Sequence, residues 1–157
     1  MPNPDTDDPE GADPEAADLP LSIDDLAGIP TTLGYRTTIH ADRAETRLSL
    51  DARHANRNGR VHGGVHCTIL DAAMGFAASR AFARAEGGRT PDTDVLTLTL
   101  VTNFVGASDG REMIAVGRID RHGRSLAFAS GEVRDERGTL LATGTATFKR
   151  THSRGAR

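Results

Sequence analysis

Cysteine is nearly absent from this chain of 157 residues, because Cys67 is the only one and has no partner for a disulfide within the chain. Tryptophan is missing and aromatic residues make up only 4%, so the stacking residues typical of a nucleic-acid binder are too few. No apolar run approaches the ~20 residues of a membrane-spanning helix, and the acidic start of the chain does not resemble a secretory signal. We therefore expect a cytoplasmic protein with neither a membrane nor a nucleic-acid partner.

Positive charge is absent from one end of the chain. Residues 1–18 hold seven acidic residues and no lysine or arginine, so the net charge of -3 divides into -7 there and +4 over residues 19–157. The acidic segment is rich in Asp, Pro and Ala and cannot bury enough apolar surface to become ordered alone. We predict a disordered acidic tail over 1–18, a single domain over 19–150 and a flexible tail over 151–157.

The hydrophobic pattern predicts strands around one long helix. Partly helical spacing favours a short helix in 19–29 that ends at Gly28 or Pro30, and residues 35–52 alternate like a strand with one wet face. Residues 65–85 are apolar on nearly all sides, which is typical of a helix buried all round. Alternating segments between short turns then predict four antiparallel strands, over 95–104, 111–121, 124–134 and 139–150. Because βαβ alternation is missing, this order predicts an α+β protein in which the sheet curls round the helix.

One carboxylate lies within the apolar helix. Asp71 is flanked by Leu70 and Ala72, and a buried carboxylate is costly unless it is hydrogen-bonded, paired or protonated. This setting makes Asp71 a candidate functional residue. The alternative is that Asp71 lies on an exposed stripe of the helix, which it would share with Cys67 and Thr68.

Two glycines mark the start of the same helix. Gly63 and Gly64 follow Val61 and His62, and the first N–H groups of a helix are unpaired and carry partial positive charge. Glycine lets a ligand approach closely, so both residues are candidates for binding an anion or a developing oxyanion; the alternative is a plain glycine N-cap. Gly64 and Asp71 lie on one face of the helix, about 10 Å apart along its axis. They would reach one carbonyl only if a second subunit supplied one of them across a two-fold axis.

Other reactive residues fit other chemistry less well. His62 and His66 are four residues apart and could share a helix face, but a zinc site needs three or four ligands and no third stands at a usual spacing. Cys67 would need an activating base to serve as a nucleophile, and a small buried core cysteine is the simpler interpretation. We therefore expect no metal site.

The residues before the helix resemble a known signature. Asn56-Arg57-Asn58-Gly59-Arg60-Val61-His62-Gly63-Gly64, with Asp71 nine residues after His62, is similar to the motif of the PaaI-like hotdog acyl-CoA thioesterases. The similarity covers roughly residues 33–150 and includes three later segments: Thr102-Asn103-Phe104, Gly123-Arg124-Ser125-Leu126-Ala127-Phe128 and Leu141-Ala142-Thr143-Gly144-Thr145-Ala146-Thr147-Phe148. The resemblance implies a hotdog fold, in which a curved antiparallel sheet wraps one long central helix. It also implies homodimers, usually paired into homotetramers, with active sites at the dimer interface.

The same resemblance implies hydrolysis of an acyl- or aryl-CoA thioester, with coenzyme A as part of the substrate and no separate cofactor. The Gly63 backbone N–H would polarise the thioester carbonyl, and Asp71 of the facing subunit would act as general base or nucleophile. Asn56 would position the water or the thioester, and His62 would orient the turn. Five further residues would contact the substrate: Gly64, Thr97, Gly123, Arg124 and Ser125. The last three would lie at the nucleotide end of coenzyme A. Asn56 and Thr97 are also our candidates for the polar contacts that offset the burial of Asp71.

The resemblance leaves the acyl group and two other functions open. Phenylacetyl-type, hydroxybenzoyl-type and medium-chain groups all fit an apolar lining that includes Met74 and Phe76. A non-catalytic acyl-CoA-binding protein of the same fold is one alternative. A dehydratase acting on acyl thioesters is another, although that reaction uses a histidine paired with a carboxylate, and Asp71 has no evident histidine companion in the helix.

Overall fold

The computed structural model describes residues 19–21, 27–87, 94–107 and 110–151. The predicted tails fall almost wholly outside the described residues, at 1–18 and 152–157, and within the described ranges no helix is long and apolar enough to cross a membrane. The elements follow in this order: β1 (Leu19–Leu21), α1 (Ile29–Leu33), β2 (Arg36–Ile39), β3 (Ala44–Ser49), the 3-10 helix η2 (Ala52–His54), α2 (Gly63–Ala85), β4 (Val95–Phe104), β5 (Glu112–His122), β6 (Leu126–Asp135) and β7 (Leu140–Arg150).

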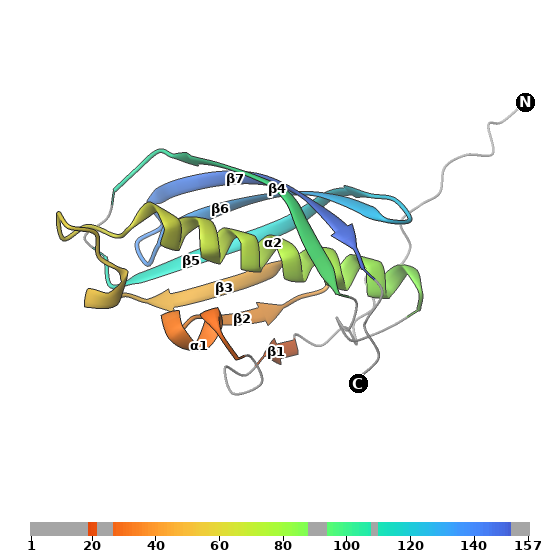
Figure 1. Cartoon of the computed structure of the whole chain (residues 1–157), viewed down its shortest axis with the longest axis horizontal. Helices are drawn as coiled ribbons and strands as arrows, with labels where there is room; N and C mark the ends of the chain where they lie inside the picture. Colours follow the sequence, from red (N-terminus) through yellow and green to blue (C-terminus); the bar gives the residue numbers. More distant parts are fainter. Residues whose placement is uncertain (1–18, 22–26, 88–93, 108–109, 152–157) are drawn as a thin grey trace, which may run out of the picture.

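The strands form one antiparallel sheet in the order β1-β2-β3-β5-β6-β7-β4. Figure 1 shows this sheet curving round α2, with β4 crossing over the helix. Strands β4 to β7 begin and end within two residues of the four predicted strands. The prediction of an α+β hotdog fold, one long helix wrapped by a curved antiparallel sheet, is therefore confirmed.

A row of three glycines lets α2 lie directly against the sheet. Gly117 of β5 pairs with Gly131 of β6, which pairs in turn with Gly144 of β7. A Cβ atom added to Gly117 would lie 2.5 Å from the backbone nitrogen of Met74, far inside van der Waals contact. The helix backbone at Met74 therefore rests on the sheet at a separation that a side chain at Gly117 would prevent.

The face of α2 towards the sheet carries the core of the molecule. Ile69, Leu70, Ala73 and Met74 are wholly inaccessible to solvent. They pack with apolar residues of the strands in one cluster, and the largest strand members of that cluster are Leu48, Met113, Val133, Leu141 and Phe148. Burial of this apolar surface is the main source of the stability of the fold.

The opposite side of α2 is only half-covered. Its residues recur at helical spacing and are all of intermediate exposure; we call them the open face of α2, and they are Cys67, Thr68, Asp71, Ala72, Gly75 and Phe76. The expectation that the helix is buried all round is wrong for this side, because the sheet of a single chain covers it only in part. Asp71 thus shares a partly exposed stripe with Cys67 and Thr68, which is the alternative that the sequence left open.

Two predictions for the first third of the chain are wrong. Residues 35–52 form two strands, β2 and β3, because the chain reverses where the His40 amide donates to the Arg43 carbonyl at 2.8 Å. This turn contains neither glycine nor proline, so the strongest turn signals are missing from it. The predicted helix in 19–29, ending at Gly28 or Pro30, is wrong where it can be compared, because Leu19–Leu21 form β1 and α1 begins directly after Gly28; residues 22–26 lie outside the described residues. Pro30 lies in the first turn of α1, where a missing N–H is tolerated.

Candidate active site

The first turn of α2 presents one unused backbone donor. His62 is the N-cap residue, and its Nδ1 accepts a hydrogen bond of 2.9 Å from the amide of Gly64. The amide of Gly63 has no acceptor among the residues that the structure describes. An anion placed before the helix would therefore meet the Gly63 N–H and the positive end of the helix dipole. The structure distinguishes the two candidate donors, since Gly63 is available and Gly64 is already bonded to His62.

The turn before α2 is held by its own side chains. Asn56 Oδ1 accepts hydrogen bonds from the amides of Asn58, at 2.9 Å, and Arg60, at 3.2 Å. The amide of His62 donates to the carbonyl of His54 at 2.8 Å, and the His54 side chain is buried. These bonds fix the position of the helix start. The side-chain oxygen of Asn56 is used within its own turn and makes no hydrogen bond with Asp71.

Asp71 lies on the open face of α2 with one of its two oxygens anchored. The hydroxyl of Thr97, on β4, donates to Asp71 Oδ1 at 2.8 Å. Asp71 Oδ2 has no hydrogen-bond partner in the described part of the chain. Of the two residues expected to accompany this carboxylate, Thr97 is in contact with it and Asn56 is not. One oxygen is therefore held in place while the other can meet a substrate or a water molecule.

Two cavities open beside Asp71. The α1 cavity, of about 470 Å³, lies towards α1, and its mainly apolar lining includes Ile29, Pro30, Tyr35, Phe76 and Leu100. The β4 cavity, of about 260 Å³, lies between α2 and the start of β4, and its lining includes Phe76, Ser79, Val95, Thr97 and Phe148. Phe76 borders both cavities, as its predicted role in the acyl lining requires. Met74 borders neither, because it belongs to the core under the helix.

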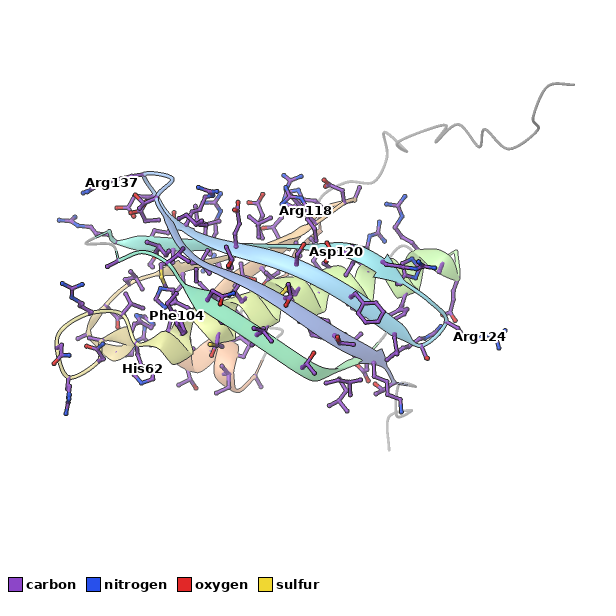
Figure 2. The ribbon with its side chains drawn as sticks, turned by 90° about the horizontal axis from the view of Figure 1, so that it is seen from above. His62, Phe104, Arg118, Asp120, Arg124 and Arg137 are labelled. Atoms are coloured by element: carbon purple, nitrogen blue, oxygen red, sulfur yellow. The ribbon has the colours of Figure 1, made fainter. Side chains whose placement is uncertain are left out.

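The predicted site residues do not all meet within one chain. Gly63 and Asp71 are eight residues apart in α2, which corresponds to a rise of about 12 Å. Figure 2 shows Arg124, in the predicted nucleotide-binding turn, at the opposite end of the molecule from His62. Asp71 and Thr97 are thus brought together, whereas Gly63 and the turn at 123–125 stand apart from them.

β4 is an edge strand with an apolar surface. It ends the strand order, so its outer edge has no partner strand in the described chain. Four of its side chains keep between 49% and 57% of their surface exposed: Leu96, Leu98, Val101 and Phe104. An edge of this kind pairs readily with another chain. The open face of α2 lies beside this strand, since α2 and β4 both line the two cavities.

His66 and Cys67 make structural contacts. His66 is buried, its ring meets the Phe104 ring edge-on with 5.7 Å between centroids, and burial lowers its pKa. Cys67 is half-buried, in contrast to the expected core cysteine, and its Sγ lies 3.6 Å from the Thr102 hydroxyl. Across the described ranges, no group of three or more His, Cys, Asp or Glu side chains is placed to hold a metal ion.

Two aromatic residues at the site are missed by the sequence pattern, which assigns them only to strands. Tyr35 lines the α1 cavity and is 5% exposed. The Phe104 ring lies against the helix start, where a Cβ atom on Gly63 would come within 3.2 Å of it. One feature of the sequence could have drawn attention to Tyr35: it is the only tyrosine of the chain and directly follows the turn residue Gly34.

The fold defines the class of the molecule as a hotdog protein. A family model described as the thioesterase superfamily matches residues 58–142, which is more than half of the chain. The chain belongs to the thioesterase superfamily and is a thioester hydrolase. The predicted family is thereby confirmed.

Known relatives agree with this assignment. The chain is 32% identical over 103 residues to PA0474 of Pseudomonas aeruginosa, which is named as an esterase, with 64% of this chain and 70% of that protein covered. It is 28% identical over 101 residues to acyl-coenzyme A thioesterase 13 of Mus musculus, with 64% and 67% covered.

Solved structures resemble the chain over most of its length. The BH2602 protein from Bacillus halodurans, solved with CoA, is 25% identical with a TM-score of 0.67, covering 82% of this chain and 79% of that one. The PaaI protein of E. coli, from the phenylacetic acid degradation operon, is 13% identical with a TM-score of 0.69, covering 83% and 88%. The likeness to PaaI concerns the fold alone.

Proposed function

We propose that the protein is an acyl-CoA thioesterase that hydrolyses an acyl- or aryl-CoA thioester to the free acid and coenzyme A. Asp71 of one subunit acts as general base or nucleophile, and Gly63 of the partner subunit supplies the oxyanion donor. One observation carries this proposal. Within the described residues, the Gly63 amide at the start of α2 and Asp71 Oδ2 have no hydrogen-bond partner, and about 12 Å along α2 separates the two residues.

The apolar edge of β4 supports the shared site. Pairing of β4 with its copy across a two-fold axis would set two α2 helices side by side in opposite directions. If that axis passes near Cys67, midway between Gly63 and Asp71, each glycine approaches the carboxylate of the other chain. We propose a homodimer built in this way, paired further into a homotetramer.

The chemistry follows from where the charge develops. Attack on the thioester carbonyl moves an electron pair onto its oxygen, and a preorganised backbone N–H at a helix start stabilises that charge without rearranging. Asp71 either removes a proton from the attacking water or attacks the carbonyl itself. The C–S bond then breaks, and the sulfur leaves with a proton as the thiol of coenzyme A. Thr97 keeps the carboxylate oriented throughout.

The cavities suggest how the substrate lies. The apolar α1 cavity suits the acyl group, because its lining offers few polar contacts. The turn Gly123-Arg124-Ser125 would contact the nucleotide end of coenzyme A from another subunit, since within one chain it lies at the far end of the molecule (Figure 2). The acyl-CoA thioesterase among the relatives and the CoA bound in the BH2602 structure support this substrate class.

Free thiol release across a panel of aryl- and medium-chain acyl-CoA thioesters tests the proposal. Asp71→Asn should lower kcat by about 10²–10⁴-fold, because it removes the base or nucleophile while preserving shape. Asp120→Asn is the matched control: Asp120 also accepts a hydroxyl hydrogen bond, from Ser130 at 2.6 Å, but lies on β5 away from His62 and Phe104 (Figure 2). It should retain the wild-type rate.

Three outcomes would contradict the proposal. A wild type that binds acyl-CoA without releasing thiol would indicate the non-catalytic binding protein. Formation of an enoyl thioester in place of thiol would indicate the dehydratase. Full activity of Asp71→Asn would show that another group performs the reaction.

A further inference from the structure

Tyr35 occupies an unusual position beside the proposed base. It is the only tyrosine of the chain and stands between α1 and β2, directly after Gly34, which ends α1 with a φ of 81°. That left-handed turn directs the chain under α2, where the Tyr35 side chain is 5% exposed and packs in the core cluster. The same side chain lines the α1 cavity together with Asp71.

The hydroxyl of Tyr35 has no hydrogen-bond partner in the part of the chain that the structure describes. Its oxygen is not among the buried side-chain atoms sealed from solvent. Burial, and secondarily the negative charge of Asp71, raises the pKa of Tyr35. Both side chains line the α1 cavity and no hydrogen bond joins them, so a small polar molecule in the cavity could contact both.

Few other groups in the α1 cavity compete for this position. The titratable side chains that line it besides Tyr35 are Asp71 and Cys67, both from α2. α1 contributes Ile29 and Pro30, and β4 contributes Leu100, all of them apolar. Asp71 Oδ1 is already held by Thr97, so Oδ2 is the carboxylate oxygen still available to a molecule in the cavity.

We propose that Tyr35 is a water-positioning residue, whose hydroxyl donates a hydrogen bond to the water molecule that Asp71 Oδ2 deprotonates. This inference rests on the proposed function and assigns Asp71 the role of general base. As the water oxygen bonds to the thioester carbon, one water proton passes to Asp71 Oδ2 and the carbonyl electron pair moves onto the oxygen facing Gly63 of the partner subunit. Collapse of that intermediate breaks the C–S bond, and the proton on Asp71 leaves with the sulfur as the thiol.

Tyr35→Phe tests the role of the hydroxyl alone, because the ring that fills the core is kept. We expect kcat to fall about tenfold with KM little changed, since one hydrogen bond to the reacting water is lost while acyl-CoA binding is preserved. Asp71→Asn, in the same assay, separates the two proposals. If Asp71→Asn keeps its activity, the proposed function fails; if only Tyr35→Phe keeps a wild-type kcat, the positioning role alone is overturned.

A spectroscopic titration tests the placement without altering Tyr35. The chain has no tryptophan and one tyrosine, so the ultraviolet absorbance of tyrosinate reports Tyr35 and nothing else. Asp71→Asn removes the nearby negative charge, and we expect Tyr35 to ionise at a lower pH in this variant than in the wild type. Asp120→Asn, on β5 and outside the lining of the α1 cavity, is the control and should leave the titration unchanged. Coincident titrations of wild type and Asp71→Asn would overturn the inference, because the two groups would then not lie close together.

Discussion

The two sides of α2 show how differently one helix can be covered. On the side towards the sheet, Ile69, Leu70, Ala73 and Met74 have no exposed surface, and Gly117 allows the helix backbone to touch the strands. On the open face, every residue from Cys67 to Phe76 that points outward is half-exposed, although most are small or apolar. The apolar edge strand β4 lies beside this face. One chain therefore buries the first side of the helix by itself and leaves the open face partly exposed.

The proposed catalytic carboxylate and the cavities beside it lie on the open face of α2. Asp71, its partner Thr97 and both cavities lie there, whereas the covered side offers only packing. An active site on an open face can be closed by a second copy of the chain, and this is the arrangement that we propose. The comparison predicts that disturbing the open face alters activity and assembly, while the covered face governs the stability of the single chain.

The largest expected effect comes from mixing two inactive variants. Asp71→Asn lacks the carboxylate, and Gly63→Pro lacks the backbone N–H at the first helical position, where proline fits the helix. If each site combines Gly63 of one subunit with Asp71 of the other, a heterodimer of the two variants holds one intact site. Co-expression should restore about a quarter of the wild-type thiol release, because about half of randomly formed dimers are mixed and half of their sites are intact.

Gly63→Ala is the matched control for the missing N–H. It introduces the same Cβ atom, 3.2 Å from the exposed Phe104 ring, but keeps the donor. We expect it to retain most of the activity, while Gly63→Pro alone loses about 10²–10³-fold in kcat. Co-expressed variants that stay at the level of either parent would show that the two residues do not act across subunits.

The next effect concerns the edge strand. Val101 is 57% exposed on β4, and Val101→Lys would place a charge in the proposed interface, which should weaken dimerisation about 100-fold. Sedimentation would detect monomers, and a short bifunctional thiol reagent would no longer link two chains through Cys67. Phe128→Lys, at a side chain 46% exposed on β6, is the control and should still give at least a dimer. If both variants form dimers equally well, β4 is not part of the interface.

Most of the fold could be predicted because its signals are local. The alternation over 95–104 and 139–150 marks β4 and β7, and the short turns that join β5, β6 and β7 make these three strands antiparallel neighbours. The pairing of β4 with β7 rather than with β5, the next strand in the chain, does not follow from such turns. The His40–Arg43 turn was hidden because it lacks glycine and proline. The contact of Gly117 with Met74 could not be predicted either, since it depends on which strand positions pair and where the helix crosses them.

The candidate site was predictable only in part. Asp71 and Gly63 stand out because a carboxylate and glycines are unusual in and around an apolar helix. The partly exposed setting of Asp71 was one of two alternatives that the sequence left open, because the apolar pattern of the helix is the same whether its own chain or a second chain covers it. The place of Tyr35 beside Asp71 arises from a turn far away in the sequence, which no spacing within the helix reveals.

A smaller effect is expected from the hydroxyl that anchors Asp71. Thr97→Val removes the 2.8 Å hydrogen bond to Oδ1 and should lower kcat about tenfold, because the carboxylate loses its fixed orientation. Thr99→Val makes the same change on the same strand at an exposed residue without this bond, and should retain the wild-type kcat. Both variants should remain dimers by sedimentation. Equal kcat values for the two would mean that Thr97 does not orient the base.

The smallest effect concerns stability at mildly acidic pH. Burial lowers the pKa of His66 from its ordinary value of 6.5, so the unfolded chain takes up the proton first as the pH falls. The free energy of unfolding should therefore be unaffected well above that value and decrease as the pH drops through it towards the lowered value in the folded protein. Between about pH 7.5 and about pH 5, the free energy of unfolding measured with urea should decrease less for His66→Gln than for the parent chain. Both proteins should also carry Val101→Lys, so that dissociation of the dimer does not contribute to the measured free energy of unfolding. The single chain suffices for this test because His66 belongs to the part of the helix that one chain buries by itself. An identical decrease in both proteins would show that the proton is taken up elsewhere.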